Sequence, residues 1–270
     1  MTTWRLMHSG ALRGAMNMAL DEALFEAVGN GTSGPILRLY RWQPATVTLG
    51  YAQRDEHAIN FQVCRESGID VVRRSTGGRA VFHHHEVTYA VIAPLDDPLF
   101  AGGILDSYRV IAEPLQCMLT ELGVRAELVP ARRSGERSAS HDICFAAPAS
   151  YELAVDGYKI AGSAQKRNDR VFLQHGSIPI DLDLLLMSKV LGKPGADNLE
   201  AMCRYLSQKV GWVNRYLESS VSLDQVEQAM ASAFQKCIPG DWQLSVPSNE
   251  EMARAKRLHD ERFFYAAWTT

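Results

Sequence analysis

A glycine pair flanked by arginines is the segment best suited to holding a ligand. It runs Arg73-Arg74-Ser75-Thr76-Gly77-Gly78-Arg79-Ala80-Val81. Glycine has no Cβ, so backbone N–H groups can approach a bound molecule closely, and guanidinium groups attract an anionic or carbonyl-bearing head group. The same composition is typical of a hairpin turn with solvated arginines. The segment alone therefore leaves both a binding loop and a simple turn open.

Cys144 and Lys159 are the residues best suited to covalent chemistry. Lys159 follows the turn pair Asp156-Gly157, and Cys144 comes shortly before the same expected hairpin. A thiolate is the nucleophilic form of cysteine, and an ammonium group can favour the thiolate and polarise a carbonyl. An arbitrary cysteine is more often a small buried hydrophobe, and a lysine beside a turn is more often solvated. His141 could assist proton transfer but is more simply interpreted as a loop residue.

Three consecutive histidines, His83, His84 and His85, suggest a metal site that their spacing does not support. Strand alternation would send His83 and His85 to one face and His84 to the other. Zinc needs three or four convergent ligands, and no other Cys/His pair has the required spacing. We therefore expect no metal, and one histidine lining a pocket.

Signatures of nucleotide binding are weak in this sequence. Gly29, Gly31 and Gly34 match G-x-G-x-x-G, but they follow a helix pattern and precede a strand pattern, the reverse of the dinucleotide-binding context. The sequence has neither a Walker-type phosphate loop nor a G-x-S-x-G elbow. A P-loop enzyme and an α/β-hydrolase are therefore disfavoured.

The composition is that of a globular protein without a general electrostatic partner. The 270 residues are 46% hydrophobic and 22% charged, enough for one sizeable core or a main domain with a small appendage. A formal net charge of -3 gives no general attraction to nucleic acid or anionic lipid. The five cysteines are scattered and odd in number, so free thiols are expected. The longest apolar cluster, 182–187, is too short to span a bilayer, and we expect a cytoplasmic protein without membrane association.

The apolar pattern predicts strands in the middle of the chain and helices toward its end. Strand patterns and an expected hairpin occupy 36–40, 45–51, 69–74, 87–93 and 151–155 with 159–164. Helical patterns occupy 16–27, 104–122 with an interruption near Pro114, 183–191, 199–217, 223–237 and 250–264. Capping-box spacing, at Ser222 with Gln225 and at Ser248 with Glu251, supports two helix starts. The predicted fold class is α+β, a mixed β-sheet with flanking helices and a helical C-terminal part.

Longer motifs place these residues in a family. Residues 73–89 fit Arg-Arg-x-Thr-Gly-Gly-Arg-Ala-x-x-His-x-x-Glu-x-Thr-Tyr, residues 144–153 fit Cys-Phe-x-x-Pro-x-x-Tyr-Glu-Leu, and 157–165 and 174–178 continue the pattern. These segments resemble the biotin/lipoate protein ligase superfamily and, within it, the cysteine-type octanoyltransferases that serve the glycine cleavage H protein. The resemblance implies a lipoate/biotin protein ligase-like fold. We divide the chain into an acyltransferase domain at 1–245 and a C-terminal helix at 246–270 packed on it.

The resemblance also implies roles for single residues. Cys144 would accept the acyl group, and Lys159 would face the thioester carbonyl. Substrate-binding positions would be Arg73, Gly77, Gly78, Arg79, Ala80, His83, Gly162 and Ser163. Octanoyl-phosphopantetheine would arrive on acyl carrier protein. The octanoyl group would pass to a lysine of a lipoyl-accepting protein, either glycine cleavage H protein or a dehydrogenase E2 domain. The expected enzyme is a monomer that uses no metal or other cofactor and binds no nucleic acid.

Three other functions stay open. An ATP-dependent lipoate ligase shares the Gly-Gly and Lys-x-x-Gly-x-Ala features but lacks the cysteine motif, so Cys144 discriminates against it. An octanoyl amidotransferase, which moves the acyl group from H protein to dehydrogenase subunits, also uses a cysteine. A non-catalytic acyl- or carrier-binding protein would show no turnover.

An arginine-rich stretch before Cys144 predicts an electrostatic effect on the donor. Arg132, Arg133 and Arg137 would meet the acidic surface expected of acyl carrier protein, with a solvated loop as the alternative. Changing all three to glutamate should raise the donor KM and flatten its dependence on salt in steady-state kinetics. Unchanged donor kinetics at low salt would contradict the idea.

Overall fold

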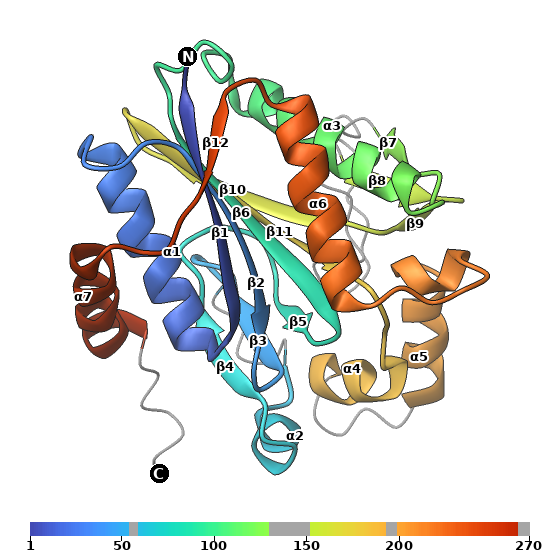
Figure 1. Cartoon of the computed structure of the whole chain (residues 1–270). Coiled ribbons are helices and arrows are strands. Elements are labelled where there is room, and N and C mark those ends of the chain that lie inside the picture. Colours follow the sequence, from blue (N-terminus) through green and yellow to red (C-terminus); the bar gives the residue numbers. More distant parts are fainter. Residues whose placement is uncertain (54–58, 130–151, 193–198, 264–270) are drawn as a thin grey trace.

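A six-stranded sheet forms the centre of the computed structural model (Figure 1). The structure describes residues 1–53, 59–129, 152–192 and 199–263. Pairing is antiparallel on one side of the sheet and parallel on the other. On the parallel side, the first strand of the chain pairs with a strand near the end of the chain. The strand order is β10 (Gly162–Arg167), β11 (Val171–Pro179), β6 (Glu86–Pro94), β2 (Ile36–Trp42), β1 (Thr3–Leu12) and β12 (Asp241–Leu244).

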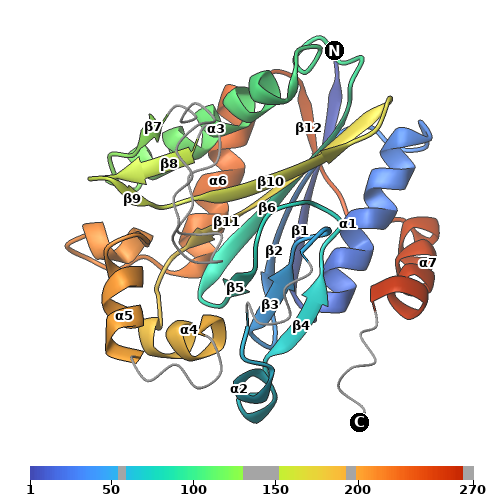
Figure 2. The same ribbon diagram turned by 180° about the vertical axis from the view of Figure 1, so that it is seen from behind.

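Two three-stranded sheets lead directly into the large one. One has the order β4 (Asp70–Arg73), β3 (Thr46–Leu49), β5 (Val81–His83), and the other β7 (Glu127–Val129), β8 (Glu152–Val155), β9 (Tyr158–Lys159). Only two residues separate β5 from β6, and two separate β9 from β10. Figure 2 shows β9 running on into β10. These short connections bring the ends of both small sheets to the large sheet.

Helices cover both faces of the large sheet, and alternation along the strands divides the core between them. The helices are α1 (Gly14–Gly29) and α7 (Asn249–Leu258) on one face, and α3 (Ile104–Glu121) and α6 (Leu223–Cys237) on the other. On β2, Leu37 and Leu39 pack into the core with α3 and α6, whereas Ile36 and Tyr40 pack into the core with α1. Successive side chains of a strand point to opposite faces, so one strand contributes to two cores.

A third core joins the three-stranded sheet β4–β3–β5 to three further helices. They are α2 (Phe61–Glu66), α4 (Leu184–Leu191) and α5 (Leu199–Ser207). Val47, Phe82 and Met187 are among its buried members. This core holds β3 and β5 in place beside the large sheet.

Several predicted elements are confirmed with small shifts of their ends. The helix over 16–27 is α1, and the expected hairpin joins β8 to β9. Asp156 and Gly157 at its turn have positive φ, 51° and 81°, as a type I′ hairpin turn requires. Both capping boxes, at Ser222 and at Ser248, are present.

The predicted helix over 199–217 is wrong in its second half. The backbone beyond α5 pairs with β9 instead: the N–H of Lys159 donates to the carbonyl of Lys209 (3.0 Å), and the N–H of Gly211 donates to the carbonyl of Lys159 (2.8 Å). A short 3-10 helix, η3 (Val213–Tyr216), follows. Strand-type bonds to β9 therefore replace the helical bonds expected there.

The expected interruption near Pro114 is also wrong, because α3 continues through it. Proline inside a helix loses a backbone hydrogen bond and costs about 3 kcal/mol. Pro114 is buried together with Ile111, Leu115 and Met118 of the same helix. Burial of this apolar face offsets the local cost.

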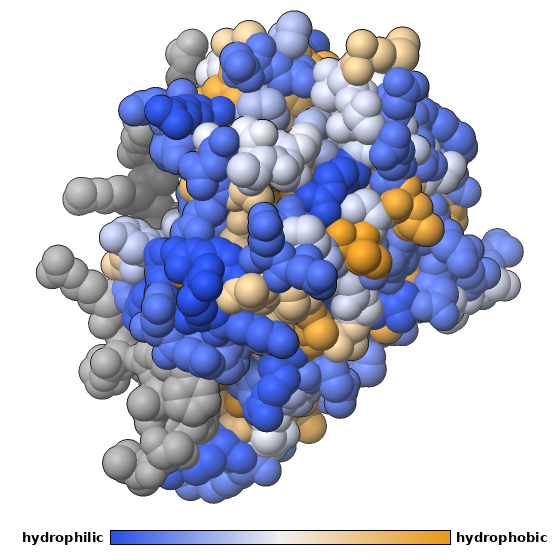
Figure 3. Space-filling view, turned by 60° about the vertical axis from the view of Figure 1, so that its left-hand side comes forward, coloured by the Kyte–Doolittle hydropathy of each residue, from blue (hydrophilic) through white to orange (hydrophobic). Residues whose placement is uncertain are grey.

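Ion pairs attach α7 to the sheet and to α1. Arg5 donates to both carboxylate oxygens of Glu251 (2.5 and 3.0 Å), and Arg254 donates to both of Glu26 (2.6 and 2.9 Å). A π-helical turn, η4 (His259–Phe263), follows where helix was expected to 264. The face that carries α1 and α7 is mostly hydrophilic, and its hydrophobic groups are small and separate (Figure 3). Within the described ranges, no helix is long and apolar enough to cross a membrane.

Candidate active site

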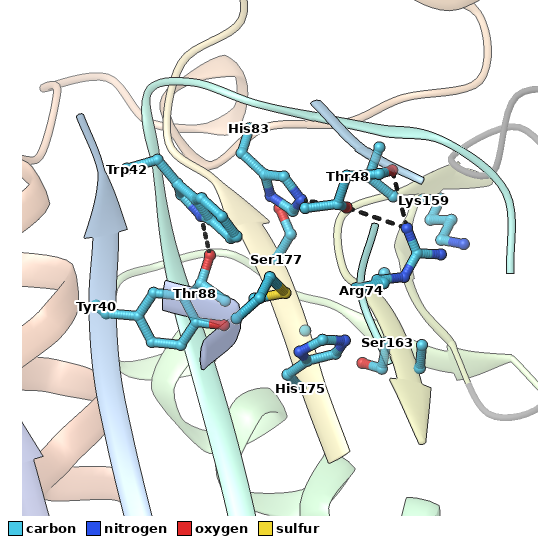
Figure 4. Close-up of a pocket in the computed structure, with 15 residues that line it drawn as sticks. Tyr40, Trp42, Thr48, Arg74, His83, Thr88, Lys159, Ser163, His175 and Ser177 are labelled. Atoms are coloured by element: carbon cyan, nitrogen blue, oxygen red, sulfur yellow. Dashed lines mark hydrogen bonds between the residues drawn. The ribbon is translucent and has the colours of Figure 1, made fainter. Parts of the chain in front are cut away.

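A cleft lies where both small sheets meet the large one. It encloses about 440 Å³ of empty space, part of it open to solvent. Tyr40 and Trp42 lie on one side of it and Lys159 on the opposite side (Figure 4). Its walls are formed by Met18, Tyr40, Trp42, Thr48, Arg74, Val81, His83, Thr88, Lys159, Gly162, Ser163, Ala164, His175, Gly176 and Ser177.

Lys159 is fixed on its side of the cleft by its own hairpin and by the segment after α5. Its ammonium group forms an ion pair with Glu152 of β8, and each of these side chains is 10% exposed. The main-chain bonds to Lys209 and Gly211 hold its backbone as well. An ammonium group is thereby presented to the cleft in a defined position.

Arg74 is a buried arginine that holds the Gly-Gly turn. It is 4% exposed and directly follows β4. Its guanidinium donates to the carbonyl oxygens of Gly77 (2.7 Å) and Arg79 (2.8 Å). It also donates to the carbonyl and the hydroxyl oxygen of Thr48 on β3, both at 3.0 Å. The turn and β3 are therefore connected through one side chain.

The Gly-Gly turn also lies backbone to backbone against the end of β3. The N–H of Tyr51 donates to the carbonyl of Thr76 (2.8 Å). A Cβ on Gly50 would come within 1.8 Å of the carbonyl oxygen of Gly78, so only glycine fits at that point. Gly78 itself has φ 95°, a conformation that side chains with a Cβ rarely adopt.

His83 is fixed between a threonine and a glutamate. Its Nε2 lies 2.9 Å from Thr48 Oγ1, and its Nδ1 lies 2.8 Å from Glu86 Oε1. The ring of Trp42 stacks on the imidazole, with centroids 4.2 Å apart and planes at 19°. The hydroxyl groups that donate to the same carboxylate belong to Thr88 and Ser177.

The predicted alternation of the three histidines is wrong. Strand β5 ends at His83 and β6 begins at Glu86, so His84 and His85 form the connection instead of continuing a strand. Of these three histidines, His83 lines the cleft. Among the residues that the structure describes, no group of three or more His, Cys, Asp or Glu side chains is arranged to hold a metal ion.

His175 is the second histidine of the cleft, and a buried ion pair lies behind it. Its Nε2 lies 2.7 Å from Thr76 Oγ1, and its Nδ1 lies 3.3 Å from Asp21 Oδ2. Asp21 forms an ion pair with Arg38 at 2.6 Å and accepts a hydrogen bond from the hydroxyl of Tyr40 at 2.9 Å. The Arg38 side chain is 0% exposed, so this pair lies within the protein core.

Burial and charge together determine the ionisation of His175, Asp21 and Tyr40. Burial lowers the pKa of His175, and the nearby Asp21 only partly opposes that shift. For Asp21, burial alone would raise the pKa, but the charge of Arg38 and the contact with His175 bring it below its ordinary value. Burial raises the pKa of Tyr40 well above its ordinary value. Near neutral pH the group therefore contains an ionised Asp21 beside a neutral imidazole and a neutral phenol.

Some of the predicted site residues line the cleft and others lie beside it. Lys159, His83, Gly162 and Ser163 are in its walls. The other predicted substrate-binding residues belong to the end of β4 and the turn after it and do not occur among the described lining residues: Arg73, Gly77, Gly78, Arg79 and Ala80.

Arg73 and Ala80 have structural contacts of their own. Arg73 donates to the carbonyl oxygens of Gly50 (2.6 Å) and Gln53 (2.7 Å), and Ala80 is buried in the third core. Cys144 lies outside the described residues. The roles expected for all of these residues stay predictions.

The predicted site lacks several of the lining residues, among them Thr48, Arg74 and His175. Strand alternation offers a signal for Arg74, because it places Arg74 on the same face as the buried Val72. His175 lies within the Gln-His-Gly motif but has no neighbour in sequence that suggests its partner. Thr48 carries no signal that the sequence alone reveals.

Residues 13–235 match the family model of the lipoyl protein ligase A/B catalytic domain. Two similar proteins are named octanoyltransferase LipM. The one from Lysinibacillus sphaericus is 36% identical over 99% of this chain and 99% of its own length. The one from Kyrpidia tusciae is 38% identical over 97% of this chain and 98% of its own.

Solved structures share the fold along nearly the whole chain. A bi-partite lipoate protein ligase from Thermoplasma acidophilum, studied with its E2 lipoyl domain, is 25% identical with a TM-score of 0.80, and the match covers 99% of this chain and 96% of that one. A lipoate-protein ligase A bound with ATP is 24% identical with a TM-score of 0.77, covering 100% of this chain and 97% of that one. The predicted α+β fold of lipoate protein ligases is confirmed.

The fold is thus that of protein-lipoylating enzymes. The chain belongs to the lipoyl protein ligase A/B catalytic domain family.

The Gly-Gly turn generates a prediction about stability. Alanine at Gly78 would have to adopt φ 95°, and such strain costs about 1–3 kcal/mol. Alanine at the neighbouring Gly77 is the matched control, because its Cβ would meet no atom within 4 Å. Urea unfolding should therefore show a clear loss of stability for Gly78→Ala and a change within about 0.5 kcal/mol for Gly77→Ala. Equal losses would contradict this account of the turn.

The depressed pKa of His175 generates a prediction about pH. As the pH falls, the unfolded chain binds a proton at this histidine at about pH 6.5, and the folded protein does so only at a lower pH. Its contribution to stability is therefore complete above the unfolded pKa and is lost as the pH falls from there through the folded pKa. His175→Gln cannot titrate, so its free energy of unfolding should fall less steeply between about pH 7.5 and about pH 5. Identical slopes for wild type and variant would refute the assignment.

Proposed function

We propose that this chain is an octanoyltransferase of lipoate biosynthesis that moves an octanoyl group from acyl carrier protein to a lysine of a lipoyl-accepting protein. The cleft carries the proposal, because it has an ammonium group on one side and two aromatic rings on the other. An octanoyl chain needs apolar surroundings for its tail and a polar group only at its carbonyl. The carbonyl would lie beside Lys159, and the methyl end would point toward Tyr40 and Trp42. Full-length similarity to octanoyltransferases supports the same activity.

The aromatic side of the cleft offers apolar surface in spite of its polar atoms. The hydroxyl of Tyr40 donates to Asp21, and the indole N–H of Trp42 donates to Thr88 Oγ1 at 2.7 Å. Both polar atoms are thus satisfied within the protein, and the rings remain available to an alkyl chain. This arrangement suits a saturated acyl tail.

The first chemical step transfers the acyl group to Cys144. The thiolate of Cys144 attacks the octanoyl carbonyl carbon, a new C–S bond forms, and the C–S bond to phosphopantetheine breaks. The departing thiolate takes up the proton that Cys144 had lost. The ammonium group of Lys159 stabilises the negative charge that develops on the carbonyl oxygen. One thioester replaces another, so the step is nearly balanced in energy.

The second step releases the product. The amine of the acceptor lysine attacks acyl-Cys144, an amide bond forms, and Cys144 leaves as a thiolate that accepts the proton lost by the amine. An amide is more stable than a thioester, so this step is downhill and requires no ATP, other cofactor or metal. The acceptor is glycine cleavage H protein or a dehydrogenase E2 domain, and the enzyme acts as a monomer.

A covalent octanoyl-Cys144 species is the decisive expectation. Incubation with octanoyl-acyl carrier protein alone should add one octanoyl mass to the enzyme, labile to hydroxylamine and mapped to Cys144 by peptide mass spectrometry. Cys144→Ala should form no adduct and show no turnover, because no nucleophile remains. Cys144→Ser should trap a slow ester that resists hydroxylamine. Lys159→Ala should slow loading by about 10²–10³-fold without moving the site of modification.

Cys64 provides the internal control for the labelling. Burial raises the pKa of its thiol to about 12, so it should carry no octanoyl group, and Cys64→Ala should load as the wild type does. Full activity of Cys144→Ala would overturn the covalent mechanism. Pyrophosphate release with ATP and free octanoate would then identify a ligase.

A further inference from the structure

A chain of hydrogen bonds leads from Arg74 to a buried carboxylate through His83. Arg74 Nη1 donates to Thr48 Oγ1 at 3.0 Å, and that oxygen lies 2.9 Å from His83 Nε2. His83 Nδ1 lies 2.8 Å from Glu86 Oε1. The side chains of His83 and Glu86 are 8% and 3% exposed. Water therefore competes little for these bonds.

A second chain of the same composition leads from Arg74 through His175. Arg74 Nε donates to Thr76 Oγ1 at 3.2 Å, which lies 2.7 Å from His175 Nε2. His175 Nδ1 lies 3.3 Å from Asp21 Oδ2. The guanidinium group of Arg74 is thus the first donor of two hydrogen-bond chains, each of which continues through a threonine and a histidine to a carboxylate. Both histidines line the cleft.

The chemistry of the groups allows one direction of these bonds in which every proton has an acceptor. A guanidinium group can only donate, so each threonine oxygen accepts from Arg74, and its hydroxyl proton finds an acceptor in the histidine Nε2. Nε2 is then the acceptor of each ring, and the ring proton lies on Nδ1, where a carboxylate accepts it. The low pKa of His175 agrees with a neutral ring.

We propose that Arg74 is a positioning residue that holds both cleft histidines in the neutral Nδ1–H tautomer, and that this tautomer makes the cleft suitable for an alkyl chain. The connection to catalysis rests on the proposed octanoyltransferase function. In this state both ring nitrogens of His83 and His175 are engaged within the protein. Neither ring has a spare N–H for a ligand or a water molecule, and the cleft favours an unsubstituted acyl tail over one with a polar group.

Loss of Arg74 would remove the first donor from both hydrogen-bond chains at once. Each threonine hydroxyl could then turn, and nothing would require Nε2 to remain an acceptor. An Nε2–H ring would place a lone pair against Glu86 or Asp21, so the ring would have to rotate. The carbonyls of Gly77 and Arg79 would lose a partner as well. The acyl chain and its carbonyl would consequently be held less accurately.

Histidine tautomers can be measured directly by long-range 1H–15N NMR of the full chain labelled at histidine. Wild type should show the Nδ1–H form for both His83 and His175, assigned with single histidine variants. Thr48→Val should change only the His83 pattern, and Thr76→Val only that of His175, because each removes one hydroxyl. Arg74→Lys should change both, since lysine lacks the planar fork of donors. An Nε2–H ring at either position in the wild type would overturn the proposal.

Acyl loading tests whether the tautomers matter for the reaction. Arg74→Lys should load Cys144 more slowly, on the order of 10²-fold, as misplacement of reacting groups generally does. Arg5→Lys is the matched control: it alters an arginine that pairs with Glu251 beside α7, and it should keep both tautomers and normal loading. Normal loading by Arg74→Lys with altered tautomers would overturn the positioning role.

The two measurements separate this proposal from the proposed function. A wild-type protein that is never acylated would refute octanoyl transfer, while the NMR pattern still decides the tautomer assignment. The single threonine variants provide that decision even where Arg74→Lys fails to fold.

Discussion

The need of buried arginines for hydrogen-bond acceptors is the constraint on which the rest of this structure depends. A guanidinium group keeps its charge in proteins, so Arg38 and Arg74 must find oxygen atoms in the protein interior. Arg38 reaches Asp21 and Asn17 of α1, both at 2.6 Å. Arg74 reaches β3 and the Gly-Gly turn. Apolar packing alone would allow α1 and the turn to shift, whereas these bonds specify one arrangement. Removing Asp21 would leave the buried charge of Arg38 without its carboxylate, at a cost of about 3–5 kcal/mol.

The cleft exists because two strands leave their small sheets for the large one at nearly the same place. His83 ends β5 and Glu86 begins β6, so their side chains meet across a two-residue connection. Lys159 and Gly162 bracket the second connection in the same way. A short motif in the sequence thus begins in a small sheet and ends in the large one. This explains why residues close in sequence line different walls of one cleft.

This arrangement also explains which parts of the site the sequence could predict. His83, Lys159, Gly162 and Ser163 lie within linear motifs, so a family resemblance carries them directly. The partners of Arg74 come from β3 and, through His175, from β11 and α1, and their meeting depends on the order of strands. Composition and periodicity contain no information about that order.

The fold shows the same limit. Runs of β-favouring residues identified β2 and β6, and helical spacing identified α1 and α6, because these signals are local. The apolar pattern gives no indication of β1 or β12, which pair in parallel from opposite ends of the chain. On β1 buried and exposed residues do not alternate regularly. Arg5 pairs with Glu251, and His8 pairs with Glu227. The helix expected beyond α5 fails for a related reason, as its backbone bonds are taken by β9.

The carboxylate beside Lys159 balances the charge of the ammonium group at the cleft. Glu152 and Lys159 form an ion pair in which each side chain is 10% exposed, so the pair is neutral as a whole. A thioester carbonyl brings no charge of its own. A phosphate or an acyl adenylate would be attracted by Lys159 and repelled by Glu152, so this pair does not by itself separate acyl transfer from an ATP-dependent ligation. In the proposed reaction that separation therefore depends on the nucleophile at Cys144.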